Sequence, residues 1–296
     1  MTMDAKYLAL VQMAVGGGVM GMAYALVAYG FQLTYAAGKA VNFGQGELVM
    51  LGAFAGITLT GIGLPYWAVV PGAMVIGALL GWFIERVAVR LALKQRNEGW
   101  ILLTIIVGLF ALSAVENIWG REDRPFPVPW PAEAVDFYGI SFTWSELAIV
   151  VGALGMMTLV ELAKRYTMAG IAVQAVSADP DAAELCGIRS QSAISLSWAV
   201  SGAAAAFAGT VIGPVTTVGP TMAAALTLKA FSVAVVAGLD SGFGLVIAGV
   251  ALGAAENLSG YALGSGWREA PGLILLILAL ALRPQGVFGK KIIRKV

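Results

Sequence analysis

Long stretches without a charged residue limit what this chain can fold into more than any other feature of its sequence. The intervals Lys6–Lys39, Glu47–Glu85 and Arg189–Lys229 carry no charged residue between their ends. Each interval exceeds the roughly 20 apolar residues that a membrane-spanning helix needs. Charged residues make up only 12% of the chain, against about a quarter of a soluble domain. The sequence therefore predicts an all-α, polytopic membrane protein. The roughly ten-residue alternating segments of a transmembrane β-barrel are not visible.

Nine apolar segments follow one another along the chain. They lie at about 8–30, 47–63, 66–84, 100–118, 144–163, 193–213, 226–238, 244–260 and 269–283. Several are shorter than a bilayer requires, and Pro65 and Pro71 fall near the turn sequence GIGLPYW. We therefore expect about eight to nine transmembrane helices, including broken or re-entrant segments. They would form a single transmembrane domain over residues 1–296.

Lysines and arginines gather in three parts of the chain. They are Arg86, Arg90, Lys94 and Arg96 in one connection, Lys164, Arg165 and Arg189 around a second, and Arg283, Lys290, Lys291, Arg294 and Lys295 in the C-terminal tail. Cytoplasmic loops of membrane proteins are enriched in Lys and Arg, so we expect the loop 164–192 and the C-terminus to be cytoplasmic. The loop 119–143 then faces the other side. Its proline and aromatic residues are typical of a structured cap rather than a flexible linker.

A cluster of polar residues, AVNFGQGELVM at 40–50, interrupts the apolar sequence. Asn42 and Gln45 have the spacing of the N-cap and N3 positions of a capping box, and Glu47 falls in the same first turns. The pattern predicts a helix that begins at the membrane edge or inside it, where it must be buried in protein or line a wet cavity. Half-helix N-termini of this kind face anionic substrates in some transporters. Glu47 is therefore a candidate for a transport pathway or an ion pair. The alternative is a capped helix whose glutamate reaches the headgroups.

Lys229 is a second charge inside an apolar run. Gly219 and Pro220 predict a turn and a helix start near Thr221, which places Lys229 about two turns inside that helix. A lone ammonium at this depth needs a partner or water, and Glu47 is the obvious partner by charge. A structural pair and a substrate contact both remain open. The glutamates expected near span ends, where snorkelling accounts for them, are Glu116, Glu146, Glu161 and Glu256.

The sequence SADPDAAELCGIRS at 177–190 encodes a short helix in the second basic connection. The residues that would cap it are Asp179 at the N-cap, Pro180 at the first helical position and Gly187 just after the end. We predict a helix over 180–186, with Leu185 and Ile188 as apolar residues on a surface that should be polar. Short helices of this kind dock into partner grooves. Packing against the chain's own spans is equally compatible with the spacing.

Glycine is abundant, with 38 residues. Small residues let membrane helices approach closely, so ordinary helix packing is the first explanation for them. A specific dimer face at Gly249 and Gly253 is the alternative.

Several function classes lack their motifs here. The chain has no P-loop, nucleophile elbow, H-E-x-x-H or Rossmann fingerprint. It has no histidine and a single cysteine, Cys186, which argues against a zinc or haem site. We therefore expect no enzymatic activity, no metal, no bound cofactor and no nucleic-acid partner for this chain.

Separated motifs follow one another in order along the chain, and the similarity that they carry covers essentially the whole chain. They are YGFQLTYAAGKAVNFGQGELVMLGAFAG at 29–56, the pair SADPDAAELCGI and TLKAFSVAVVAGLDS, and the closing LRPQGVFG. Together they resemble the LivH-type permeases, membrane subunits of bacterial ABC importers for branched-chain amino acids and related solutes. In that family the first motif runs close to N-F-A-H-G-E. The residues that agree with it are Asn42, Phe43, Gly46, Glu47, Met50, Gly52 and Ala53, whereas Gly44 and Gln45 depart, Gln45 standing in place of the family's histidine.

The resemblance implies an ABC importer permease fold in a bacterial inner membrane. The partners it implies are a LivM-like second permease, two P-loop ATPase subunits holding ATP and magnesium, a periplasmic substrate-binding protein and membrane lipid. It makes helix 180–186 a coupling helix that contacts the ATPase through Asp179, Pro180, Ala182, Leu185, Gly187 and Ile188. The residues it turns toward the periplasmic binding protein are Arg121, Glu122, Asp123 and Arg124 in loop 119–143, with Arg268 and Glu269.

The expected function is uptake of a hydrophobic or branched-chain amino acid, or a related carboxylate, by alternating access. Asn42, Gln45 and Glu47 would line or shape the pathway, with Lys229 opposite. Gln45 is a neutral amide that both donates and accepts hydrogen bonds, which keeps urea, short amides and aromatic acids as alternatives. A self-sufficient secondary transporter or channel explains the buried charges equally well, but not a capped apolar helix on the cytoplasmic face. A scaffolding protein explains neither feature.

Overall fold

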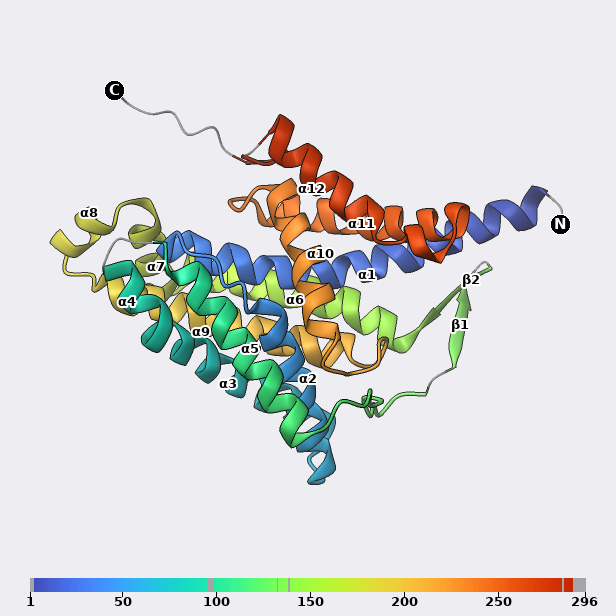
Figure 1. Ribbon diagram of the computed structural model, residues 1–296, viewed down its shortest axis with the longest axis horizontal. Helices are drawn as coiled ribbons and strands as arrows, with labels where there is room; N and C mark the ends of the chain where they lie inside the picture. Colours follow the sequence, from blue (N-terminus) through green and yellow to red (C-terminus); the bar gives the residue numbers. More distant parts are fainter. Residues whose placement is uncertain (1–2, 95–97, 132, 138, 284, 290–296) are drawn as a thin grey trace.

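The computed structural model describes residues 3–94, 98–131, 133–137, 139–283 and 285–289. Figure 1 shows a helical bundle with one small β-hairpin. The elements in chain order are α1 (Met3–Gly38), α2 (Gln45–Gly61), α3 (Tyr66–Ile84), the π-helix η1 (Glu85–Val89), α4 (Arg90–Lys94), α5 (Trp100–Ile118), β1 (Ala134–Phe137), β2 (Ile140–Thr143), α6 (Trp144–Tyr166), α7 (Met168–Ala178), α8 (Pro180–Leu185), α9 (Ser190–Ile212), α10 (Met222–Ala237), α11 (Gly242–Leu263), the 3-10 helix η2 (Ser265–Trp267) and α12 (Ala270–Leu282). The predicted all-α class is confirmed, and each of the predicted apolar segments coincides with a helix.

Seven helical segments of the described chain are long and apolar enough to cross a membrane. They are Lys6–Gly38, Tyr66–Ala92, Trp100–Ile118, Trp144–Tyr166, Ser190–Ile212, Gly242–Leu263 and Ser265–Leu282. The helices α2 and α10 have only 17 and 16 residues. At 1.5 Å per residue each is about 25 Å long, short of the roughly 30 Å hydrocarbon core. The short segments expected from the sequence are therefore α2 and α10.

Helix α3 is irregular at its end rather than at its proline. Pro71 lies inside α3 without breaking it, so the expectation of a break there is wrong. Pro71 removes the hydrogen bond to the carbonyl of Trp67 and crowds that carbonyl, yet α3 continues to Ile84. The irregular segment is η1, a π-helix over Glu85–Val89 that joins α3 to α4.

Glycines bring helix backbones into direct contact at the centre of the bundle. α1 and α11 pack along Gly17 and Gly21 on one helix and Gly249 and Gly253 on the other. A Cβ on any of the four would overlap backbone atoms of the facing helix. Small residues favour membrane helix association because the backbones pack without intervening side chains. Gly249 and Gly253 contact α1 of the same chain, so the alternative of a dimer face at these two glycines is wrong.

The helix α2 begins inside the bundle. After α1 ends at Gly38, Lys39 reverses the chain in the left-handed conformation, with a φ of 51°. Gln45, the first residue of α2, then lies against Gly30 of α1 and Ser201 in the middle of α9. The connection is therefore re-entrant. Protein covers it, which is the condition under which irregular backbone is tolerated at membrane depth.

The loop between α5 and α6 is folded onto the bundle, as expected for a structured cap. β1 and β2 pair in an antiparallel hairpin, and Phe126 is buried before it. The side-chain amide of Gln12 in α1 exchanges two hydrogen bonds with the backbone of Ser141, at 2.6 and 3.0 Å. The hairpin and the start of α1 thus lie at one end of the bundle, and α8 lies at the other (Figure 1).

Some of the residues behind the predicted orientation lie outside the described part of the chain. They are Arg96, Lys290, Lys291, Arg294 and Lys295. The cytoplasmic C-terminus and the side of the membrane that loop 119–143 occupies stay predictions.

Candidate functional site

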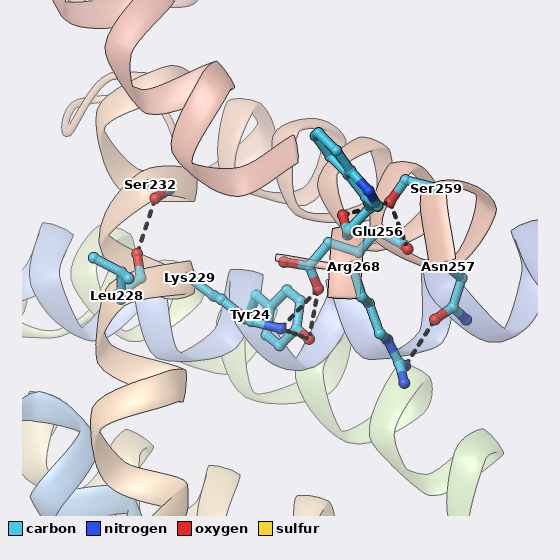
Figure 2. Close-up of polar contacts among 9 residues, drawn as sticks. Tyr24, Leu228, Lys229, Ser232, Glu256, Asn257, Ser259 and Arg268 are labelled. Atoms are coloured by element: carbon cyan, nitrogen blue, oxygen red, sulfur yellow. Dashed lines mark hydrogen bonds and ion pairs between the residues drawn. The ribbon is translucent and has the colours of Figure 1, made fainter. Parts of the chain in front are cut away.

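Lys229 forms a buried ion pair with Glu256. The Nζ atom of Lys229 on α10 lies 3.0 Å from Oε2 of Glu256 on α11, and the two side chains are 17% and 2% exposed. The Tyr24 hydroxyl on α1 donates to the same carboxylate oxygen at 3.1 Å and lies 3.5 Å from Nζ. Figure 2 shows these side chains converging from three helices. Hydrogen bonds to charged groups are strong, and this set compensates both charges at depth.

Two expectations about this pair are wrong. Lys229 is paired with Glu256 rather than with Glu47, and Glu256 is buried inside α11 rather than reaching headgroups from a span end. The sequence contains a signal for the burial of Glu256. Glu256 is the one charged residue between Asp240 and Arg268, the same isolation that singled out Lys229.

Lys229 also faces a cavity of about 360 Å³ between α10 and α12, a size within the range of small-molecule sites. Glu269 and Gly272 lie on its wall. The Oε1 atom of Glu256 is close to Gly272, and it is buried without a hydrogen-bond partner among the described residues. The cavity wall therefore carries the Lys229 side chain, which is already paired with Glu256, and the Glu269 carboxyl group, both of which can contact a polar ligand.

The turn before α12 is tied to α11 by two hydrogen bonds. Nη2 of Arg268 donates to Oδ1 of Asn257 at 2.8 Å (Figure 2), and the Ser259 hydroxyl donates to the carbonyl of Trp267 at 3.2 Å. Glu269 follows as the N-cap residue of α12. Of the two residues predicted to contact a binding protein here, Arg268 is exposed, and Glu269 is also part of the cavity wall.

Asn42 and Gln45 are buried anchors at the start of α2, 1% and 0% exposed. Nδ2 of Asn42 donates to Oε1 of Gln45 at 3.3 Å, and the Ser201 hydroxyl lies 3.3 Å from the same oxygen. The expected capping box is wrong, because Gly44 is the N-cap residue and no side chain caps the helix. Oδ1 of Asn42 instead accepts from the Gly44 amide at 3.1 Å. The two side chains hold the re-entrant backbone in place.

Glu47 lies in the first turn of α2, as predicted, and lines a separate cavity of about 390 Å³. Most of the wall is apolar, with Leu48, Leu80 and Phe83 among its residues. The carboxyl group passes so close to Gly108 of α5 that a Cβ there would lie 3.1 Å from Cδ of Glu47. Oε2 is buried without a hydrogen-bond partner in the described part of the chain. An unpaired carboxylate oxygen in such surroundings is a candidate ligand contact.

The first turns of α2 and α10 meet inside the bundle. The Gly46 amide donates to the Thr227 hydroxyl at 3.1 Å, and a Cβ on Gly46 would overlap the carbonyl oxygen of Ala223. Helix N-termini carry a partial positive charge, and transporters use half-helix N-termini at membrane depth to face anionic groups. Two such ends side by side can attract a carboxylate.

The short helix α8 is capped as the sequence predicts. Oδ1 of Asp179 accepts from the amides of Asp181 and Ala182, both at 3.0 Å, and Pro180 is the first helical residue. The helix ends at 185, one residue earlier than expected. Gly187 follows in the left-handed conformation, with a φ of 84°.

The two apolar residues of this loop differ in their surroundings. Leu185 is 91% exposed, as predicted. Ile188, which was expected to share that exposed surface, is half-buried and packs on a small apolar cluster with Val176 and Ala183. The left-handed turn at Gly187 directs the chain back toward this cluster. Leu185 is therefore the exposed large apolar residue of α8.

The loop 119–143 presents charged residues at the opposite end of the bundle. The four predicted to contact a binding protein, Arg121, Glu122, Asp123 and Arg124, are all exposed. Arg121 pairs with Glu116 at 3.0 Å, and a carboxylate oxygen of Asp123 accepts from the Thr217 hydroxyl at 3.3 Å. Exposed ion pairs of this kind contribute little stability, so they leave the side chains available to a partner.

Comparison with known proteins assigns the family. Residues 13–282 match the family described as "Branched-chain amino acid transport system / permease component". The chain belongs to this family. The resemblance to LivH-type permeases drawn from three sequence motifs is confirmed.

Two relatives are similar to the permease over almost its full length. The high-affinity branched-chain amino acid transport system permease protein LivH of Salmonella typhimurium is 29% identical, covering 99% of this chain and 100% of the relative. The corresponding protein BraD of Pseudomonas aeruginosa is also 29% identical, covering 96% and 97%. Among solved structures, PsaBC from Streptococcus pneumoniae in complex with Fab aligns with a TM-score of 0.48 and 12% identity, over 93% of this chain and 92% of that one.

Family membership and the apolar helices together make this chain a multi-pass membrane permease of an ABC importer. Its role is transport of a solute rather than chemical conversion of one. Within the described ranges, no group of three or more His, Cys, Asp and Glu residues is placed to hold a metal ion. The two cavities at Lys229 and Glu47 are therefore the candidate solute contacts of the permease.

Replacing Glu47 with glutamine is expected to slow uptake by the permease about tenfold or more. A hydrogen bond to a charged group contributes about 1.5–3 kcal/mol, and the substitution removes the charge while keeping the shape. The measurement is the initial rate of labelled solute uptake by the complete transport system. Glu98→Gln makes the same change at an exposed residue before α5 and serves as control. Equal rates for wild type and Glu47→Gln would remove Glu47 from the pathway.

Proposed function

We propose that this permease takes up a hydrophobic or branched-chain amino acid, or a related carboxylate, across a bacterial inner membrane. Alternating access is driven by ATP hydrolysis in two P-loop ATPase subunits, which hold ATP and magnesium and contact the permease through α8. The observation that carries the proposal is α8 itself. It is a capped helix with Leu185 91% exposed, at the end of the bundle away from the hairpin (Figure 1).

The surroundings of Leu185 support a protein contact at α8. An exposed leucine at the tip of a rigid, capped helix is the apolar anchor that a partner groove accommodates. Asp179 fixes the start of the helix, and the apolar cluster around Ala183 and Ile188 fixes its underside. A push on Leu185 is therefore transmitted to α7 and α9, which α8 connects.

The solute class is supported by both cavities. The meeting N-termini of α2 and α10 suit a carboxylate, whereas the apolar wall around Glu47 suits a hydrocarbon side chain. LivH and BraD are named for branched-chain amino acid transport. Aromatic acids are compatible with the same groups. Urea and short amides fit less well, because they bring no apolar part to the wall at Leu48 and Phe83.

The remaining partners follow from the two ends of the bundle. A periplasmic substrate-binding protein would contact Arg121, Glu122, Asp123, Arg124, Arg268 and Glu269. A LivM-like second permease would complete the pathway within the membrane. The C-terminus and the α8 loop would then both be cytoplasmic, in accord with the basic residues of those segments.

Replacing Leu185 with aspartate is expected to release the ATPase subunits and reduce uptake about thirtyfold or more, because truncating an apolar anchor costs about 2 kcal/mol or more. The measurement is a pull-down of the tagged permease in mild detergent, followed by uptake in proteoliposomes that contain ATP. Leu185→Met keeps the apolar contact and should behave like wild type. The permease itself should stay folded, because Leu185 is almost wholly exposed.

Two results would contradict this proposal. One is ATPase capture by Leu185→Asp equal to that of wild type. The other is solute movement by the purified chain in liposomes without any ATPase. That second result would favour a secondary transporter, in which the charges at Glu47 and Lys229 carry a coupled ion.

A further inference from the structure

A third cavity, apart from the sites at Lys229 and Glu47, lies beside α8. It has a volume of about 790 Å³ and lies between η1 with the end of α3, the first turns of α9 and the loop after α8. Arg86, Arg90 and Arg189 are on its wall, together with Ser190 and Ser192. No role described so far uses these residues.

The charge of Arg90 is neutralised within the protein. Arg90 donates two hydrogen bonds to the carboxylate of Glu85, at 3.1 and 3.2 Å. Glu85 is 0% exposed, and Gln191 and Ser195 of α9 each donate to it at 2.6 Å. This network ties the π-helix η1 to α9 and leaves the Arg90 charge satisfied.

Arg86 and Arg189 supply the positive charge that remains. Neither forms an ion pair within the described part of the chain. The Arg86 guanidinium lies 5.0 Å from the ring centroid of Trp82. Arg189 is exposed and precedes α9, whose N-terminus no side chain caps. Glu184 is the acidic residue on the wall, so two arginines and a helix N-terminus leave a positive excess.

The charged cavity adjoins an apolar groove at Leu196. Leu196 of α9 lines both this cavity and another of about 340 Å³ between α6, α7 and α9. The wall of that second cavity is almost wholly apolar, with Met74, Met156, Val200 and Ala203 on it. A positive end followed by an apolar groove matches the two parts of a phospholipid.

We propose that this combined site, the arginine groove, binds an anionic phospholipid. The phosphate lies at Arg86 and Arg189, and one acyl chain runs past Leu196 toward Ala203. Basic pockets between membrane helices on the cytoplasmic side bind anionic headgroups, and tryptophan is enriched at that level of the membrane. A carboxylate from a protein partner would meet the arginines but leave the apolar groove unfilled, so a lipid accounts for more of the site.

A bound lipid would contact the loop that carries α8. Glu184, Gly187 and Ile188 line the same cavity as the arginines. Headgroup occupancy therefore holds this loop in place where α8 meets its partner. That consequence rests on the proposed role of α8, whereas lipid binding itself does not.

Native mass spectrometry of the purified chain in detergent tests the site, with phosphatidylglycerol and phosphatidylcholine as probes. The wild-type chain should retain phosphatidylglycerol in preference. Arg86→Gln with Arg189→Gln should weaken its retention about thirtyfold, since each basic residue near an anionic headgroup contributes about fivefold. Arg283→Gln removes the same charge at the end of α12 and should match wild type. Ala203→Trp fills the groove and should weaken retention while leaving the arginines intact.

Four results would overturn the proposal. The first is equal retention of the two lipids by the wild-type chain. The second is unchanged retention of phosphatidylglycerol by the double arginine variant. The third is displacement of phosphatidylglycerol by inorganic phosphate, which would make the site one for free phosphate. The fourth is loss of a co-purifying ATPase subunit from the double variant with lipid retention unchanged, which would assign the arginines to a protein contact.

Discussion

Lys229→Met is expected to destabilise the permease by about 3–5 kcal/mol, because breaking a buried ion pair leaves an uncompensated charge. Glu256 is 2% exposed, and its second oxygen already lacks a partner among the described residues. Without the Lys229 ammonium, the Tyr24 hydroxyl would be the remaining donor to this carboxylate. Chemical unfolding in mixed micelles measures the loss.

A double-mutant cycle separates the interaction energy of the Lys229–Glu256 ion pair from the contributions of the two single side chains. Lys229→Met combined with Glu256→Gln removes both charges and should recover most of the lost stability, since replacing a whole buried pair is often close to neutral. Glu256→Gln alone should cost less than Lys229→Met alone, because Lys229 is partly exposed and faces a cavity. A double variant as unstable as Lys229→Met would show that the ion pair is not the source of the effect.

Two adjacent glycines of α1 are expected to respond to alanine with opposite signs. Gly17→Ala should destabilise the permease by about 2 kcal/mol, as overpacking of a close contact does. Its new Cβ would overlap the carbonyl of Gly253 and lie 2.9 Å from the Cα of Ala254. Gly16→Ala should stabilise by up to about 1 kcal/mol, because glycine inside a helix costs that much relative to alanine. The nearest neighbour of that Cβ would be Asn257, at 3.8 Å.

The measurement is again unfolding in mixed micelles, with the amount of folded protein in the membrane as a second readout. The neighbouring positions share helix, depth and residue type, so only the facing backbone differs. Equal effects at the two positions would mean that the contact between α1 and α11 does not hold the bundle together as closely as the structure indicates.

Apolar runs predicted the helices, and capping residues predicted the short helix α8. The segments that became helices, the start of α10 beside Thr221 and the capped helix α8 all follow from local sequence, because an apolar run or a proline after Asp179 acts within a few residues. The isolated charge of Lys229 in an apolar run likewise indicated a buried charged site. Features that depend only on neighbouring residues can therefore be predicted from the sequence.

Contacts between residues far apart in the sequence could not be predicted in the same way. Glu47 and Glu256 are both lone acids in apolar runs, and nothing in the spacing states which one meets Lys229. The answer depends on α10 packing beside α11 and α1, and that packing depends on the glycine contact between α1 and α11. The capping role predicted for Asn42 was wrong for a related reason. Its side chain is held by Gln45 and Gly44 in a re-entrant connection, where the ordinary capping geometry of a surface helix does not apply.

The π-helix η1 sets the rotational phase between α3 and α4. Glu85 and Arg90 are five residues apart and still meet, although five residues of a regular α-helix turn a side chain about 140° away from its start. The wide turn acts as a one-residue insertion that keeps the helix continuous while rotating everything after it by about 100°. A regular α-helix through the same residues would point Arg90 away from Glu85. The ion pair between Glu85 and Arg90 therefore depends on the wide turn of η1 as well as on the two side chains.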